Sequence, residues 1–138
     1  MTDDVIVQGT AVSGDDPERL RAALDDAGLT GAEVDHLEAH GTGTALGDPI
    51  EMGAVAKVLG ESRTEDHPLV MGAVKANIGH LESASGMAGL VKAVLVMQHE
   101  QAPANAELDS LNSKIGAVVE DFSVRFPTAL CPVEGHGH

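Results

Sequence analysis

The chain of 138 residues carries a formal net charge of −14 and two aromatic residues, both phenylalanine. Such an acidic chain is not expected to bind nucleic acid or an anionic membrane, which are polyanions. No apolar run approaches the roughly 20 residues that span a bilayer. A single cysteine cannot form an internal disulfide, which suits a reducing compartment. We therefore expect a cytoplasmic protein, or a plastid one whose targeting segment is missing.

The first part of the chain predicts two strands and one helix. Residues 5–12 are rich in β-branched side chains and predict a strand closed by a turn. A helix is expected to start at Asp16, with Pro17 in its first turn, and to stop at Gly28. Residues 34–39 predict a second strand, which leads into a loop of glycine and threonine.

The middle of the chain predicts two more helices and a third strand. Asp48 is expected to cap a helix that runs to about Leu59. Residues 69–74 predict the third strand, and residues 81–98 a long helix with small residues in its first half. A helix this small and apolar is expected to be buried and closely packed on several sides.

The remaining residues add less. Residues 118–126 are expected to contain one or two strands, and residues 131–138 are expected to form a loose tail. Strand followed by helix, three times over, predicts an α/β layered fold in a single domain of residues 1–130.

Two strand-to-loop junctions carry the residues with chemical potential. The first is EAHGTGTALGDPIE, which contains His40, and the second is VKANIGH, which ends in His80. Ligands commonly bind at the carboxyl ends of strands in α/β folds, and the small neighbours leave room for a substrate beside each imidazole.

The two motifs together resemble the C-terminal half of a β-ketoacyl synthase of the polyketide and fatty-acid type, with the match covering roughly residues 34–112. The resemblance implies a C-terminal half of the thiolase-like fold and decarboxylative Claisen condensation of malonyl and acyl thioesters held on acyl carrier protein. It implies His40 and His80 as the two active-site histidines, with Lys75 supporting them. Further supporting residues by the same resemblance are Asp48, Glu51, Thr42, Thr44 and Asn77.

That chemistry fits the residue types, because decarboxylation leaves an enolate whose oxygen needs hydrogen-bond donors. Two imidazole N–H groups can donate without a metal or cofactor. We therefore expect no metal and no cofactor at this site. His80 is expected to act as a neutral donor, since the start of the following helix and the cationic Lys75 both disfavour an imidazolium.

The chain also departs from the family pattern. In the family the nucleophilic cysteine lies in the N-terminal half, and Cys131, within Leu130-Cys131-Pro132, does not match that motif. The family's glycine-rich segment with its Phe does not follow, and the stretch 12–19 is short. We therefore expect an isolated half that needs the N-terminal half as a partner and that alone leaves an apolar helix face exposed.

Two functions remain open at this point. One is a portion of an acyl-condensing transferase, and the other is a non-catalytic synthase-like binding module or isolated fragment. Carrier proteins are usually acidic, so a chain of charge −14 is expected to repel them unless basic docking residues lie elsewhere.

His36, His67 and His99 lie in no recognised motif and are expected to be structural or exposed. No metal site is expected from Cys131, His136 and His138, which offer three ligands without a fourth.

Overall fold

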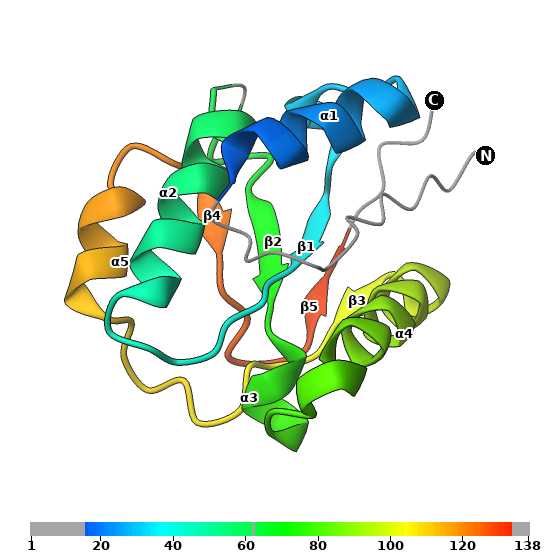
Figure 1. Ribbon diagram of the computed structural model, residues 1–138, viewed down its shortest axis with the longest axis vertical. Helices are drawn as coiled ribbons and strands as arrows, with labels where there is room; N and C mark the ends of the chain where they lie inside the picture. The colour runs from blue at the N-terminus through cyan, green and yellow to red at the C-terminus, as the bar shows by residue number, and fades with distance from the viewer. Residues whose placement is uncertain (1–15, 62, 134–138) are drawn as a thin grey trace.

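The computed structural model describes residues 16–61 and 63–133 (Figure 1). The strand expected at residues 5–12 lies outside them. In chain order the elements are α1 (Pro17–Ala27), the short 3-10 turn η1 (Gly31–Glu33), β1 (His36–Glu38), α2 (Gly47–Leu59), β2 (Leu69–Gly72), α3 (Val74–Ile78), η2 (Glu82–Ala84), α4 (Ser85–His99), β3 (Gln101–Ala102), α5 (Ser113–Val118), β4 (Val124–Arg125) and β5 (Cys131–Pro132).

Within the described residues, a parallel sheet of three strands lies at the centre, in the order β1-β2-β4. His36 pairs with Val70 at one side of β2, and Leu69 pairs with Val124 at the other. A separate antiparallel pair joins β3 to β5. Helices join the parallel strands, as parallel pairing requires, so the predicted α/β layered class is confirmed.

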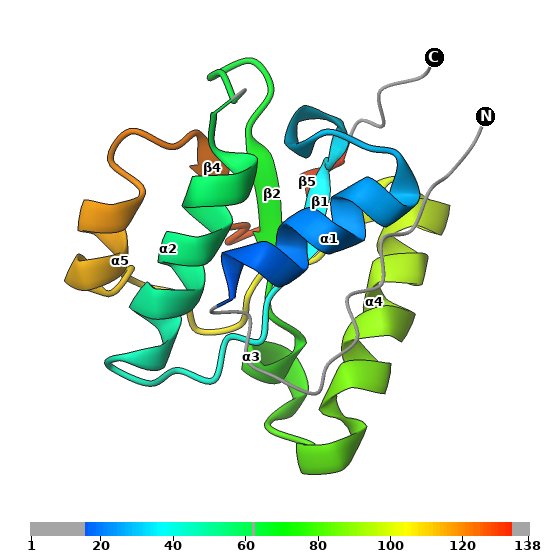
Figure 2. The same ribbon diagram turned by 45° about the horizontal axis from the view of Figure 1, so that its top comes forward.

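The sheet separates two apolar clusters. Leu69 and Met71 pack with buried residues of α1, α2 and α5 on one face, whereas Val70 packs with Val96 of α4 and with the β3–β5 pair on the other. Successive side chains of a strand point to opposite faces, which explains the alternation along β2. Figure 2 shows α2 and α4 on opposite sides of the strands, with the start of α1 beside α2.

The start of α1 follows the sequence prediction. The carboxylate of Asp16 accepts a hydrogen bond from the backbone N–H of Glu18 at 3.0 Å, as an N-cap does. Gly28 ends the helix with a left-handed backbone, φ +67°, a conformation that glycine adopts without steric cost.

Several expected boundaries were wrong. Leu46, not Asp48, occupies the cap position of α2, because Asp48 lies inside the first turn and its carboxylate reaches back to the loop. The strand expected at 69–74 ends at Gly72, and Val74 begins the short helix α3. Cys131 and Pro132, expected to be loose, form β5 because they pair with β3.

The expectation that the long helix is packed on several sides was also wrong. α4 starts at Ser85 and buries Ser85, Lys92 and Val96 against the rest of the chain. Its other side exposes large apolar side chains, as expected for an isolated half: Met87, Val91, Val94 and Leu95. None of the helices in the described ranges is long and apolar enough to cross a membrane.

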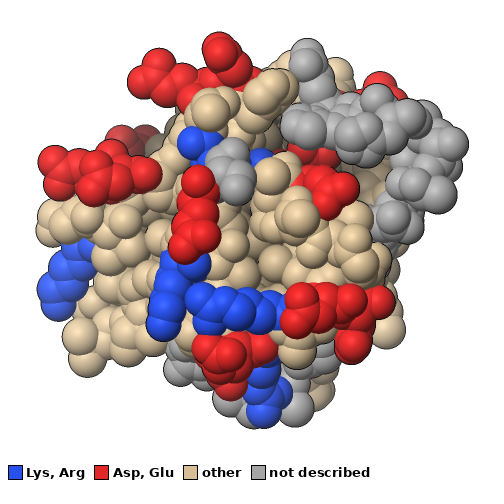
Figure 3. Space-filling model, turned by 90° about the horizontal axis from the view of Figure 1, so that it is seen from above, with Lys and Arg blue, Asp and Glu red and all other residues tan. Residues whose placement is uncertain are grey.

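Charged side chains are mixed on the face that Figure 3 shows. Asp and Glu lie there in several separate groups, with Lys and Arg between them.

The guanidinium of Arg63 donates to the backbone carbonyls of Gly31 and Val34, and so fixes the segment that leads into β1. Burial lowers the pKa of its guanidinium, and the nearby charge of Asp35 opposes that shift.

Candidate active site

The two motif histidines meet beyond the carboxyl ends of two neighbouring strands. His40 follows β1, and His80 follows β2 and α3. Because β1 and β2 are parallel partners, their carboxyl ends share one edge of the sheet, at the bottom of Figure 1 beside α3. The two imidazole rings lie 6.0 Å apart between centroids, in an edge-to-face arrangement of 83°. A small group could therefore contact both rings at once.

Hydrogen bonds with α2 hold the loop that carries His40. The carboxylate of Glu51 accepts two backbone hydrogen bonds, from the N–H of His40 at 2.7 Å and that of Gly41 at 3.0 Å. Asp48 accepts from the N–H of Gly43 at 3.2 Å, and the hydroxyl of Thr44 accepts from the N–H of Gly47 at 3.0 Å. These contacts satisfy donors that a loop would otherwise leave unpaired, so the loop is folded onto the start of α2.

Lys75 in the first turn of α3 sets the hydrogen-bonding state of His40. Its Nζ lies 3.1 Å from Nδ1 of His40. An ammonium group can only donate, so Nδ1 must accept. The imidazole proton of His40 is then assigned to Nε2, the nitrogen on the far side of the ring.

His80 receives the same assignment from different partners. The backbone N–H of Glu82 donates to its Nδ1 at 2.8 Å, and the hydroxyl of Ser85 lies 3.2 Å from the same atom. With Nδ1 accepting, the proton of a neutral ring lies on Nε2. Both histidines thus keep Nδ1 occupied by a donor and offer Nε2–H as a donor of their own.

The other residues expected to support the site are divided between the loop and α3. The side chain of Asn77 donates to the carbonyl of Ala104 at 2.9 Å, and so ties α3 to the segment after β3. Thr42 lies half-buried within the loop. His40, His80 and Asn77 are all exposed to solvent, so the site is open.

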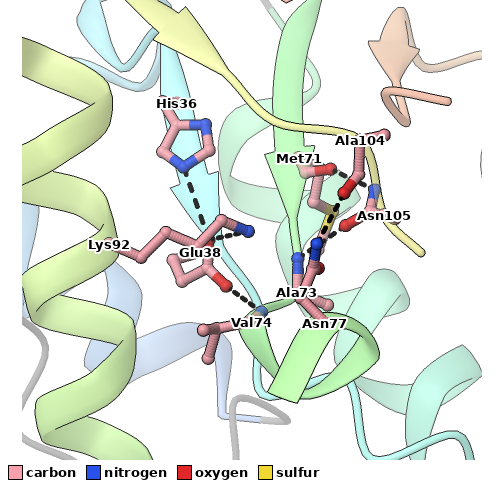
Figure 4. A network of polar contacts seen from close by, with 9 residues as sticks. All are labelled: His36, Glu38, Met71, Ala73, Val74, Asn77, Lys92, Ala104 and Asn105. Atoms are coloured by element: carbon pink, nitrogen blue, oxygen red, sulfur yellow. Dashed lines mark hydrogen bonds and ion pairs between the residues drawn. The ribbon is translucent and has the colours of Figure 1, made fainter. Parts of the chain in front are cut away.

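A buried polar group next to this site received no role from the sequence (Figure 4). Glu38, at the end of β1, accepts a hydrogen bond from the N–H of Val74 and lies 2.9 Å from Nζ of Lys92. Lys92 is the one Lys or Arg in α4. A lone cation within an apolar helix was the signal for a buried partner.

Asn105 is a second residue whose role the sequence did not reveal. It is 8% exposed, and its amide accepts from the N–H of Ala73 at 2.9 Å and donates to the carbonyl of Met71 at 3.2 Å. It lies in a segment that was expected to be irregular, where a buried asparagine has no periodicity to mark it.

Neither a reactive thiol nor a metal site is found among the described residues. Cys131 is 7% exposed and packs with Val70, Val96 and Ala102, so its thiol is closed to a substrate. Within the described parts of the chain, no three His, Cys, Asp or Glu side chains are grouped to hold a metal ion.

Comparison with known proteins places this chain in a family. The sequence profile described as "Beta-ketoacyl synthase, C-terminal domain" matches residues 3–109. The chain belongs to the β-ketoacyl synthase family. The matched region contains both motif histidines and Lys75.

Curated relatives are large polyketide synthases. The chain is 54% identical over 117 residues to a subunit of the phenolphthiocerol/phthiocerol polyketide synthase of Mycobacterium tuberculosis, and the match covers 85% of this chain and 6% of the relative. It is 49% identical over 107 residues to polyketide synthase GfsA of Streptomyces halstedii, covering 77% of this chain and 1% of the relative. The chain therefore spans a small part of the curated relatives that it matches.

Solved ketosynthase structures share the fold. Ketosynthase twelve of the bacillaene polyketide synthase from Bacillus amyloliquefaciens superposes with a TM-score of 0.77 at 29% identity, covering 99% of this chain and 24% of that one. An oxazolomycin ketosynthase domain of Streptomyces albus gives the same TM-score at 32% identity, covering 88% of this chain and 21% of that one. The chain is thus a C-terminal ketosynthase half with the thiolase-like fold, as the motifs predicted.

Proposed function

We propose that this ketosynthase half supplies the hydrogen-bond donors for decarboxylative condensation of thioesters. The substrates are malonyl and acyl groups carried as thioesters on acyl carrier protein. The names of the curated relatives favour polyketide assembly over fatty-acid synthesis. The observation that carries the proposal is that a donor group lies on Nδ1 of each histidine, which leaves Nε2–H of both rings to act as a donor.

The two donors act on the oxygen where negative charge develops. The bond between the malonyl carboxylate and its α-carbon breaks, CO₂ leaves, and the electron pair moves into the thioester carbonyl as an enolate. Nε2–H of His40 and of His80 donate to this oxygen as the charge develops on it, which lowers the barrier to decarboxylation. When no acyl thioester is present for the enolate to attack, a proton from water adds to the α-carbon and the product is an acetyl thioester.

Lys75 serves this reaction through His40. Its contact with Nδ1 excludes the tautomer that would leave Nε2 without a proton. Glu51 fixes the backbone at His40 and Gly41, so the ring cannot leave the site with the loop. Both act as positioning residues in this proposal.

Condensation also needs a nucleophile to hold the growing acyl chain. Cys131, the one cysteine of the sequence, is buried in the apolar cluster that contains Val70 and Val96, and cannot take that role in this fold. We therefore propose that the nucleophile comes from an N-terminal ketosynthase half, which is a partner of this domain in the reaction.

The proposal predicts malonyl decarboxylation that depends on both histidines. His80→Ala is expected to lower the rate by about 10²–10³, because removing one donor of an oxyanion site costs that much. Mass spectrometry of malonyl-loaded carrier protein, incubated with this chain, measures conversion to acetyl-carrier protein. The variant His99→Ala, which changes an exposed histidine at the end of α4, is the matched control and should retain the wild-type rate.

The alternative outcome is equally definite. A folded wild-type chain that binds carrier protein without converting malonyl to acetyl would favour the binding-module function, for which the exposed side of α4 offers a contact surface. Conversion that persists in His40→Ala/His80→Ala would contradict the donor pair altogether.

A further inference from the structure

Two buried polar side chains, one on each side, accept hydrogen bonds from the backbone at the start of α3. On one side Glu38 of β1 accepts from the N–H of Val74, and on the other Asn105 accepts from the N–H of Ala73 (Figure 4). These are consecutive N–H groups at the start of a helix, where the helix itself provides no acceptor. Asn105 also donates to the carbonyl of Met71, so its single amide joins the end of β2 to the start of α3.

The candidate site begins directly after this turn. Lys75 is the next residue after Val74, and its Nζ must stay within hydrogen-bond distance of His40 to define the donor state of that ring. α3 has five residues, too few to be stable by itself. Its direction therefore depends on the groups that hold its first turn.

Burying the charge of Glu38 costs free energy, and the opposite charge of Lys92 offsets part of that cost. The side chains of Glu38 and Lys92 are 8% and 10% exposed, and their charged atoms lie 2.9 Å apart. The ring of His36 lies on the same side of β1, with Nε2 3.5 Å from the same carboxylate oxygen. Burying an ion pair stabilises a fold little or not at all relative to apolar residues of similar size, so stability alone does not account for a charged pair here.

The geometry of the helix packing is adapted to this carboxylate. A side chain at Gly72 would place its Cβ 2.8 Å from Oε2 of Glu38 and 2.7 Å from Nζ of Lys92. A Cβ at Gly89 of α4 would lie 3.4 Å from Cγ of Glu38. Both neighbouring elements thus present glycine where the pair needs space.

We propose that Glu38, with Lys92 as its counter-ion, and Asn105 are positioning residues that set the first turn of α3 and thereby hold Lys75 on Nδ1 of His40. The pair links α4 through β1 to the site, so the carboxylate transmits the position of α4 to α3. We call Glu38, Lys92 and Asn105 together the clamp. Its role in catalysis rests on the proposed function, but its effect on the position of α3 does not.

A matched pair of double variants isolates the hydrogen bond from the charges. Glu38→Gln/Lys92→Met removes both charges and keeps a side-chain oxygen for the N–H of Val74. Glu38→Leu/Lys92→Met removes both charges and that oxygen. Because apolar replacement of both partners of a buried ion pair is commonly tolerated, both variants are expected to fold.

The clamp predicts a local difference between these variants. In Glu38→Leu/Lys92→Met, amide hydrogen exchange of Val74 should be at least tenfold faster than in the Gln variant, with exchange at Val70 in β2 unchanged. In protein labelled with ¹⁵N-histidine, His40 should change from the single Nε2–H tautomer to a mixture of tautomers. A residue that only stabilised the fold would raise exchange at Val70 and Val74 together.

The outcomes separate the clamp from the proposed function. Equal Val74 exchange and an unchanged His40 tautomer in both double variants would overturn the positioning role. Wild-type protein that fails to decarboxylate malonyl would count against the proposed function and leave these two readouts valid. If the Leu variant does not fold, Asn105→Leu gives the same test from the other side, with a tenfold rise expected in Ala73 exchange and no rise meaning that the clamp is wrong.

Discussion

At the scale of single residues, Gly41 determines how closely the loop of His40 approaches the end of β2. Its backbone has φ +49°, in the left-handed region, and a Cβ there would lie 2.8 Å from Cβ of Ala73. The position thus excludes a side chain for two separate reasons. The loop that carries His40 can lie close to Ala73, at the start of α3, because Gly41 has no side chain.

Gly41→Ala is expected to destabilise the protein by about 1–3 kcal/mol, from backbone strain at positive φ and overlap with Ala73. Urea unfolding followed by circular dichroism measures this loss. Gly116→Ala is the matched control, because a Cβ at Gly116 in α5 meets nothing within 4 Å. That change should stabilise the protein by about 0.4–1 kcal/mol. A Gly41→Ala protein as stable as wild type would mean that the loop can move away from Ala73.

At the scale of elements, α4 has two unlike sides. One side brings Gly89 and Lys92 against β1 and buries Val96 on the sheet. The other exposes Met87, Val91 and Leu95, which are spaced four residues apart and so form one stripe. An exposed apolar stripe of this kind marks a surface that associates with another apolar surface.

Val91→Lys/Leu95→Lys is expected to reduce concentration-dependent self-association of this chain, as measured by sedimentation velocity. The two added positive charges lower the net negative charge and so weaken repulsion between copies. A decrease in association would therefore come from the lost apolar contact. Leu130→Lys, at an apolar residue that is 64% exposed outside α4, should have little effect. Association that responds to Leu130 and not to the α4 pair would contradict the assignment of the stripe.

At the scale of the whole molecule, one short sheet supports two apolar clusters. The larger cluster joins α1, α2 and α5, and the smaller joins α4 to the β3–β5 pair, with Leu69 and Val70 contributing to opposite sides of the same strand. Losing β2 would therefore remove both clusters together, which favours a single cooperative unfolding transition. The sequence contains no Trp or Tyr, so a reporter other than intrinsic fluorescence is needed.

Cys131 provides that reporter. Its thiol is 7% exposed in the smaller cluster, so labelling by a thiol reagent should be slow in native buffer. The labelling rate should rise with urea along the same curve as the loss of circular dichroism. Leu130→Cys in a Cys131→Ala background, one residue away and exposed, should react at once. Fast labelling of Cys131 well below the unfolding midpoint would mean that the β3–β5 pair opens on its own.

The sequence by itself predicted what depends on neighbours along the chain. Asp16 and Gly28 delimit α1 as expected because capping and left-handed turns are local properties. The fold class followed from the alternation of strands and helices, and the family from the motifs around His40 and His80. The meeting of those two histidines was implied by the resemblance, and their orientation was not.

Only the tertiary structure decided the contacts between distant segments. Asp48 was expected to cap a helix, but its carboxylate is used by the loop before it. Val74 looked like the end of a strand, and it starts α3 because acceptors 36 residues earlier, on Glu38, and later in the chain, on Asn105, hold the N–H groups of its first turn. Glu38 and Lys92 resemble ordinary surface charges until β1 and α4 are packed together. No local pattern encodes such pairs, because their free energy depends on burial, and burial is a property of the assembled layers.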